Sequence, residues 1–154
     1  MLVRLVFDCT KETMYPLAKE GFSGGSQVYV KQIIKGMVAQ GHDVHVIAND
    51  LEVDEQRGEH EWWWNPSCHP TQFDIAIQQM HCNPEPRYEA PILILMTSCV
   101  DPDLGPDGQW ARAIDAIPVF SNVHRELLLK VRPTVDADKV FITGLGVGVN
   151  TEGE

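Results

Sequence analysis

Residues 24–48 read GGSQVYVKQIIKGMVAQGHDVHVIA and combine three patterns in a fixed order. A glycine pair opens the segment, apolar residues recur at helical spacing through 30–38, Gly41 ends the helix, and 44–48 is an apolar run. An earlier apolar run, Leu2 to Phe7, precedes them. A strand, a loop, a helix and a second strand in this order form the unit from which parallel sheets are built. The sequence therefore predicts an α/β fold.

Further apolar runs continue this pattern along the chain. They are continuous Leu, Ile and Val rather than alternating, as in strands covered by helices on both faces. The other predicted strands are 61–64, 73–77, 91–96, 117–120 and 140–143, and the predicted helices are 27–40, 109–114 and 122–131. We expect one domain of 154 residues with a Rossmann-like, doubly wound parallel sheet.

Ligands of such sheets bind outside the carboxyl ends of the strands. The loops that follow the predicted strands should therefore line a cleft. These loops begin after Phe7, Ile77, Met96 and Phe120.

Composition excludes several classes of function. The formal net charge is −10, and the 12 Lys and Arg residues are spread along the chain, which disfavours binding to nucleic acid or anionic membranes. No apolar run approaches the roughly 20 residues that span a bilayer, and residue 2 already opens a strand, so a cytoplasmic location is expected. The four cysteines, Cys9, Cys68, Cys82 and Cys99, are expected to be reduced thiols because a core of this size needs no disulfide.

The order of motifs resembles the N-terminal domain of a GT-B-fold glycosyltransferase, in particular the retaining family 4 that uses nucleotide-sugar donors. The resemblance rests on short segments spread over nearly the whole chain. They are Gly24–Val30, Gly41–Ile47, Phe73–Ala76, Pro118–Ser121, Asp138–Ile142 and Gly146–Asn150.

The resemblance implies a transferase that works as two halves. In such enzymes a second Rossmann-like domain follows and supplies most nucleotide and sugar contacts, including a Glu pair separated by seven residues. We therefore expect the acceptor-side half of an enzyme that is inactive alone, completed by a C-terminal domain in cis or in trans. Its substrates would be a nucleotide-diphosphate sugar and a saccharide or small-molecule acceptor, with no metal or other cofactor.

The glycine pair carries the donor-binding hypothesis. In the family, these glycines allow the N-terminus of the first helix to approach the donor diphosphate. Gly24, Gly25, Ser26 and Gln27 are the residues expected there, because backbone N–H groups at a helix N-terminus attract phosphate. A simple turn before a helix is the alternative interpretation.

Acceptor and catalytic candidates follow other strands. Related enzymes often place a His or an Asp after the fifth strand, beside the reacting sugar; this chain has Thr97, Ser98 and Asp101 there. Thr97 and Ser98, together with Ser121, are acceptor-binding candidates, while Asp101 and His81 are the catalytic candidates. An ordinary strand-end turn accounts for the polar residues equally well.

Two other features have structural alternatives. Cys68-His69 and His81-Cys82 contain metal-ligand residue types, but no Cys-x-x-Cys motif accompanies them, so no metal site is expected. The tryptophans 62–64 either stack on a sugar or pack beneath a loop or a second domain.

A second hypothesis for the whole chain is a stand-alone Rossmann-like module that binds a nucleotide or another phosphate ligand without catalysis. The fold alone does not separate it from a half-enzyme. A nicotinamide dehydrogenase is less favoured because the Gly-x-Gly-x-x-Gly spacing is absent.

Overall fold

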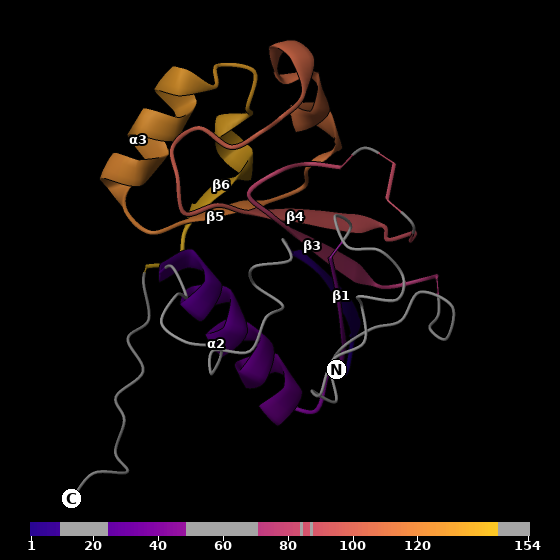
Figure 1. Cartoon of the computed structure of the whole chain (residues 1–154). Coiled ribbons are helices and arrows are strands. Elements are labelled where there is room, and N and C mark those ends of the chain that lie inside the picture. Colours follow the sequence, from indigo (N-terminus) through magenta and orange to yellow (C-terminus); the bar gives the residue numbers. More distant parts are fainter. Residues whose placement is uncertain (10–24, 49–70, 84, 87, 145–154) are drawn as a thin grey trace, which may run out of the picture.

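The computed structural model describes residues 1–9, 25–48, 71–83, 85–86 and 88–144. In these ranges the chain forms six strands, two α-helices and two short 3-10 helices, η1 and η2 (Figure 1). The elements are β1 (Arg4–Cys9), α2 (Gly25–Ala39), β2 (Asp43–Ala48), β3 (Ile75–Gln79), β4 (Ile92–Met96), η1 (Pro106–Ala113), β5 (Ile117–Val119), α3 (Asn122–Val131), η2 (Ala137–Lys139) and β6 (Val140–Ile142).

The described strands pair in parallel. Four of them form a sheet in the order β2-β1-β3-β4, and β5 pairs with β6. A parallel bridge between Ile94 and Ala116 joins β4 to the segment that leads into β5. The expected α/β fold with a parallel sheet is thereby confirmed.

Helix α2 covers one face of this sheet. Its residues Val30 and Ile34 are buried against Leu5 and Phe7 of β1 and Val46 of β2. The helix ends where the sequence predicts, because Gly41 adopts a φ of 82°, a conformation that glycine reaches without steric penalty. The apolar residues of α2 recur at helical spacing because they lie on the side of the helix that is buried against the sheet.

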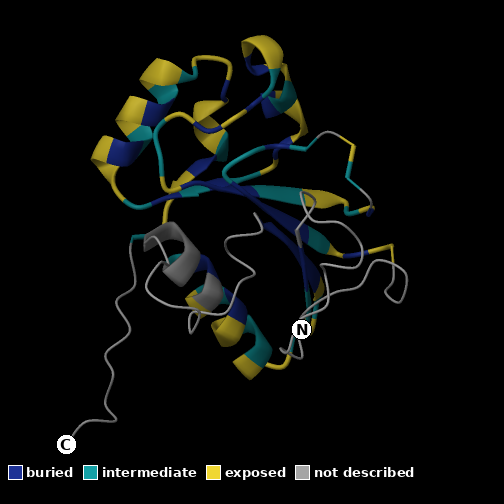
Figure 2. Ribbon diagram, in the orientation of Figure 1, coloured by how far each residue is buried: buried dark blue, intermediate teal, exposed yellow. Residues whose placement is uncertain are grey.

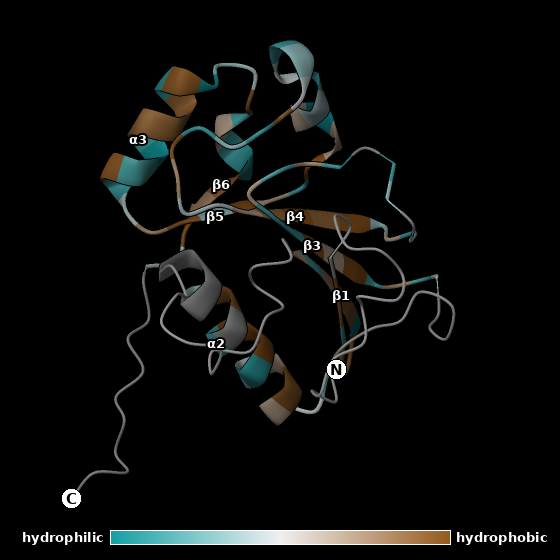
Figure 3. Cartoon of the chain, in the orientation of Figure 1, coloured by the Kyte–Doolittle hydropathy of each residue, from teal (hydrophilic) through white to brown (hydrophobic). Residues whose placement is uncertain are grey.

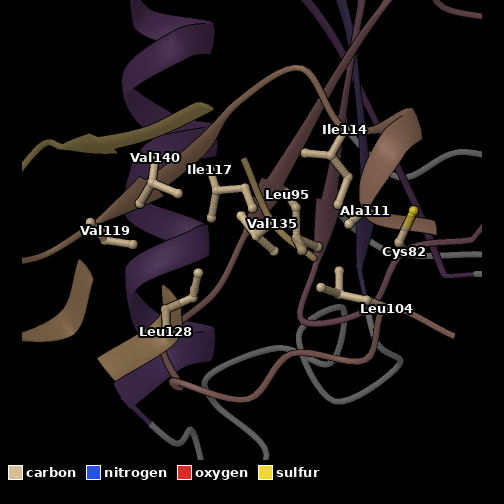
Figure 4. Packing of buried hydrophobic residues seen from close by; sticks show 10 residues of the cluster. All are labelled: Cys82, Leu95, Leu104, Ala111, Ile114, Ile117, Val119, Leu128, Val135 and Val140. Atoms are coloured by element: carbon tan, nitrogen blue, oxygen red, sulfur yellow. The ribbon is translucent and has the colours of Figure 1, made fainter. Parts of the chain in front are cut away.

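Helix α3 and η1 lie on the opposite face (Figure 1). Leu95 of β4 points to this side and is buried together with Ile114, Ile117 and Leu128. Figure 4 shows these side chains converging from β4, β5, α3 and the end of η1. Both faces of the sheet therefore carry helices, which is why its strands are apolar runs rather than alternating patterns.

Hydropathy and burial coincide in the sheet. The strands are mostly hydrophobic in Figure 3 and mostly buried in Figure 2, whereas the outer side of α3 is exposed. No helix in the described ranges has the length and apolar character needed to cross a membrane.

The strand boundaries differ from those expected. β1 runs over Arg4–Cys9 rather than 2–7, because its pairing with β2 starts at Arg4 opposite Asp43. β3 runs over Ile75–Gln79 rather than 73–77, and its two terminal glutamines pair with the apolar end of β4. Both shifts move polar residues into strands, so pairing with a neighbour outweighed local composition.

The predicted helix 109–114 is wrong in type and extent. The structure has the 3-10 element η1 there, with positive φ values of 53° at Asp107 and 68° at Gly108 inside it. Such values interrupt α-helical hydrogen bonding. The predicted strand 61–64 lies outside the described residues.

Candidate functional site

The carboxyl edge of the sheet brings the first turns of α2 next to the ends of β3 and β4. The four strands of the sheet are parallel, and α2 returns in the opposite direction, so its N-terminus lies at this edge (Figure 1). A concavity there is lined by Tyr29 and Val30 of α2, Gln79 and Met80, and the segment Met96–Ser98. Its volume of about 10 Å³ leaves room for about one water molecule. A larger ligand would have to lie above the edge.

The glycine pair falls at the start of α2. Gly24 lies outside the described residues, whereas Gly25, Ser26 and Gln27 form the first turn of the helix. The N–H groups of a first turn have no partner within the helix and carry its positive dipole end. The structure thus places three of the four expected donor-binding residues at the carboxyl edge.

Thr97 and Cys99 close a tight turn directly after β4. The Thr97 hydroxyl donates to the Cys99 carbonyl oxygen at 2.8 Å and accepts from the Cys99 amide at 3.2 Å. Thr97 is only 3% exposed, whereas Ser98 at the tip of the turn is exposed. The hydroxyl of Thr97 therefore holds the turn, and Ser98 is accessible to solvent.

Met80, the residue after β3, has a φ of 68°, which is unusual for a side chain of this size. This conformation brings its sulfur to 3.5 Å from both the amide nitrogen and the hydroxyl oxygen of Ser98. Uncommon backbone conformations of this kind often occur at binding sites.

His124 connects the turn after β4 to the start of α3. Its Nε2 lies 3.0 Å from the Cys99 carbonyl oxygen, and the Phe120 amide donates to its Nδ1 at 3.4 Å. These partners fit a ring that accepts at Nδ1 and donates from Nε2. Tyr29 of α2 packs edge-on against Phe120, with 5.1 Å between ring centroids. Side chains from both faces of the sheet therefore meet at this edge.

Ser121 caps helix α3. Its side chain accepts a hydrogen bond from the His124 amide at 3.1 Å, the expected geometry of an N-cap. The Ser121 hydroxyl, which was expected to bind the acceptor sugar, is thus already a hydrogen-bond acceptor in the cap of α3.

The two catalytic candidates lie on neighbouring segments. The carboxylate of Asp101 forms an ion pair with Arg132, at 2.6 Å between Oδ1 and Nε. His81 is half-buried and its backbone forms a parallel bridge with Asp103. The ion pair links Asp101 to Arg132, the residue that follows α3.

A buried polar cluster lies between β1 and β3. Asp8 and Gln78 are register partners at the carboxyl ends of these strands, and both are fully buried. The Tyr88 hydroxyl donates to Asp8 Oδ2 at 2.9 Å, and Gln78 Nε2 lies 2.9 Å from the same hydroxyl. Gln78 also accepts from the Asn83 amide at 2.8 Å. β2 pairs on one side of β1 and β3 on the other, so the strand order reverses at this point. Crevices of α/β sheets form where the strand order reverses.

Burial and charge shift two titratable groups beside this cluster. Burial raises the pKa of the Tyr88 hydroxyl, and the negative charge of Asp8 raises it further. Burial also raises the pKa of the Cys82 thiol to about 11, with Asp103 and Asp8 adding to the effect. Both groups are therefore neutral at physiological pH.

Sequence reasoning missed His124 and the pair Asp8 and Gln78. Ending the first predicted strand at Phe7 left Asp8 in a loop, and ending another at Ile77 did the same for Gln78. A polar residue directly after each apolar run was the available signal. His124 follows the cap Ser121 by three residues, but nothing local indicates its contact with Cys99, 25 residues earlier.

A larger concavity, of about 780 Å³, lies at the opposite edge. Three of its charged residues are engaged with each other, because Arg4 donates from Nε to Asp43 and from its amide to Asp74, both at 2.7 Å. Burial opposes ionisation of Asp43, but the hydrogen bond from Arg4 and the charge of His45 outweigh it and lower the pKa of Asp43. These contacts make the concavity a weaker ligand candidate than the carboxyl edge.

The remaining candidates are only partly described. Among the described residues, no group of His, Cys, Asp and Glu is placed to hold a metal ion, and Cys82 and Cys99 are free thiols. Cys68, His69 and the tryptophans 62–64 lie outside the described residues.

Comparison of the chain with protein-family models, curated proteins and solved structures gave no match. The function is therefore argued from the motifs and from the geometry of the carboxyl edge.

Proposed function

We propose that this chain is the acceptor-side, Rossmann-like domain of a GT-B-type retaining glycosyltransferase. The complete enzyme transfers a sugar from a nucleotide-diphosphate donor to a saccharide or small-molecule acceptor. A second α/β domain, in cis or in trans, supplies most contacts to the nucleotide and the donor sugar.

One observation carries the proposal. The first turn of α2, formed by Gly25, Ser26 and Gln27, lies at the same edge as the ends of β3 and β4. A diphosphate above this edge meets N–H groups and the positive end of the helix dipole, while an acceptor meets the turn that carries Ser98. This arrangement is the one that the family resemblance leads us to expect.

The chemistry assigned to this domain is positioning and charge stabilisation. Negative charge develops on the diphosphate as the glycosidic bond breaks, and preorganised N–H donors stabilise such charge without proton transfer. Holding the acceptor hydroxyl close to the anomeric carbon lowers the barrier further. Asp101 and His81 remain the candidates for contact with the reacting sugar.

The test is a titration of the ¹⁵N-labelled chain with UDP, GDP and ADP, followed by NMR. We expect shifts confined to the first turn of α2, with a Kd of about 1 mM or weaker because the nucleotide half of the site belongs to the other domain. The variant Gly25→Val should abolish these shifts, since its side chain blocks close approach of a phosphate. Gly36→Ala is the matched control in the same helix, because a Cβ at Gly36 has no neighbour within 4 Å.

The possible outcomes separate the hypotheses. Micromolar binding by the isolated chain would favour the stand-alone nucleotide-binding module instead. Shifts that are absent from the first turn of α2, or that survive Gly25→Val, would contradict the phosphate role.

A further inference from the structure

The acceptor candidates at the carboxyl edge differ in what their hydroxyl groups already do. Thr97 is buried and its hydroxyl both donates and accepts within the turn, and Ser121 accepts the capping hydrogen bond of α3. Ser98 is exposed, and among the described residues the hydrogen-bond partner of its hydroxyl is the sulfur of Met80. A thioether sulfur is a weak acceptor, so a ligand hydroxyl replaces it at little cost.

The position of Ser98 depends on a residue from another element. The Cys99 carbonyl oxygen, one residue beyond Ser98, accepts from Thr97 within the turn and lies 3.0 Å from His124 Nε2. His124 is itself held in place by its ring, its backbone and its burial. Its Nδ1 accepts from the Phe120 amide, its own amide donates to Ser121, and the residue is 8% exposed.

We propose that Ser98 is the hydroxyl that binds a sugar hydroxyl of the acceptor, and that His124 is the positioning residue that holds the Thr97–Cys99 turn in place for it. This inference rests on the proposed function and narrows it. It assigns the acceptor contact to one residue and gives α3 a role at the site.

The geometry favours a polyol as the ligand. Beside the Ser98 hydroxyl, the edge offers the aromatic ring of Tyr29 and the thioether of Met80, which are apolar surfaces next to a polar group. Sugars combine hydroxyl groups with apolar C–H faces and suit such a surface. Arg132 is paired with Asp101, so an anionic acceptor gains little from this cation.

The positioning role is tested through the thiol of Cys99. We compare wild type, His124→Leu and His124→Gln by iodoacetamide labelling at pH 8 and quantify each cysteine peptide by mass spectrometry. Loss of both ring hydrogen bonds in His124→Leu loosens the turn, so labelling of Cys99 should accelerate about tenfold. His124→Gln keeps a donor for the Cys99 carbonyl and should restore most of the slow rate.

Cys82 serves as the internal control for these measurements. Its thiol is buried and its pKa is raised to about 11, so it should stay slow in every variant that remains folded. An unchanged Cys99 rate in His124→Leu, or equal acceleration of Cys82 and Cys99, would overturn the positioning role.

The acceptor contact is tested separately by NMR, with methyl glycosides of glucose, galactose, mannose and N-acetylglucosamine at 50 mM as probes. At least one should shift the Ser98 amide in wild type and His124→Gln, but not in Ser98→Ala or His124→Leu. If no glycoside shifts this amide while UDP, GDP or ADP still shifts the first turn of α2, the inference fails and the proposed function stands. If the nucleotides fail as well, the proposed function falls with it.

Discussion

At the scale of single residues, the Asp8 carboxylate is held by contacts from distant parts of the chain. It is fully buried on β1 and takes hydrogen bonds from Tyr88 and Gln78, which come from 80 and 70 residues further along the chain. Burying a carboxylate is costly unless donors replace the lost water. The Tyr88 hydroxyl is therefore a stabilising group as well as a titratable one.

Replacing this hydroxyl should affect stability in a pH-dependent way. Tyr88→Phe is expected to lower the free energy of unfolding by about 1–3 kcal/mol at pH 7, because Asp8 loses a buried donor. The raised pKa of Tyr88 stabilises the fold fully below the unfolded pKa of about 10, and this contribution is lost as the pH rises above it. The difference between wild type and Tyr88→Phe should thus shrink between pH 9.5 and 11.

Urea unfolding at a series of pH values measures this difference. Tyr29→Phe is the matched control, since Tyr29 is half-buried and has no described contact with Asp8. Equal pH dependence of wild type and Tyr88→Phe would show that Tyr88 does not resist ionisation in the folded state.

At the scale of elements, two glycines differ in whether replacement by alanine should raise or lower the free energy of unfolding. Gly36 lies in α2, is exposed, and has open space where a Cβ would stand. Gly105 precedes η1 with a φ of 75°, and a Cβ there would lie 2.3 Å from the Trp110 ring. The same change to alanine therefore removes flexibility in one place and creates strain and a clash in the other.

Thermal or urea unfolding of both variants should separate these effects. Gly36→Ala is expected to stabilise the chain by about 0.5–1 kcal/mol, through helix propensity alone. Gly105→Ala is expected to destabilise it by about 1–3 kcal/mol. Equal effects of the two changes would mean that η1 is not held in the conformation described.

The cap of α3 gives a second prediction at this scale. Ser121→Ala should lower the free energy of unfolding by about 1 kcal/mol, because the His124 amide loses its acceptor. Ser121→Asn keeps a capping side chain and should be close to wild type. Ser98→Ala, which alters an exposed hydroxyl outside the helix, should leave stability within about 0.5 kcal/mol. A neutral Ser121→Ala would mean that the cap contributes nothing to stability.

At the scale of the whole molecule, charge is the dominant property. The formal net charge of −10 creates self-repulsion that unfolding relieves. Described ion pairs such as Arg4 with Asp43 are largely exposed, and such pairs contribute at most about 1 kcal/mol. Repulsion therefore outweighs them in the response to salt.

Raising KCl from 10 to 300 mM should consequently raise the melting temperature by a few degrees, since the Debye length falls from about 30 Å to below 8 Å. Differential scanning calorimetry at constant pH measures the change. Sucrose at matched osmolality controls for general exclusion effects. A melting temperature that falls with KCl would mean that ion pairs outweigh repulsion.

Much of the fold could be predicted from the sequence because its signals are local. Helical spacing of apolar residues located α2 and α3, and continuous apolar runs located the strands that the structure describes. Strand boundaries were less accurate, since a strand begins and ends where its neighbour allows pairing. The 3-10 geometry of η1 was missed because it depends on positive φ values at Asp107 and Gly108.

The sequence by itself determined the α/β class, the order of the paired strands and of helices α2 and α3, and the presence of a glycine-led helix at the start of the fold. Only the tertiary structure decided which polar groups meet: Asp8 with Gln78 and Tyr88, and His124 with Cys99. The physical reason is the separation along the sequence over which each effect acts. Periodicity and turn preferences act over a few residues, whereas these contacts join residues 25 to 80 apart and exist only once the strands have paired in register.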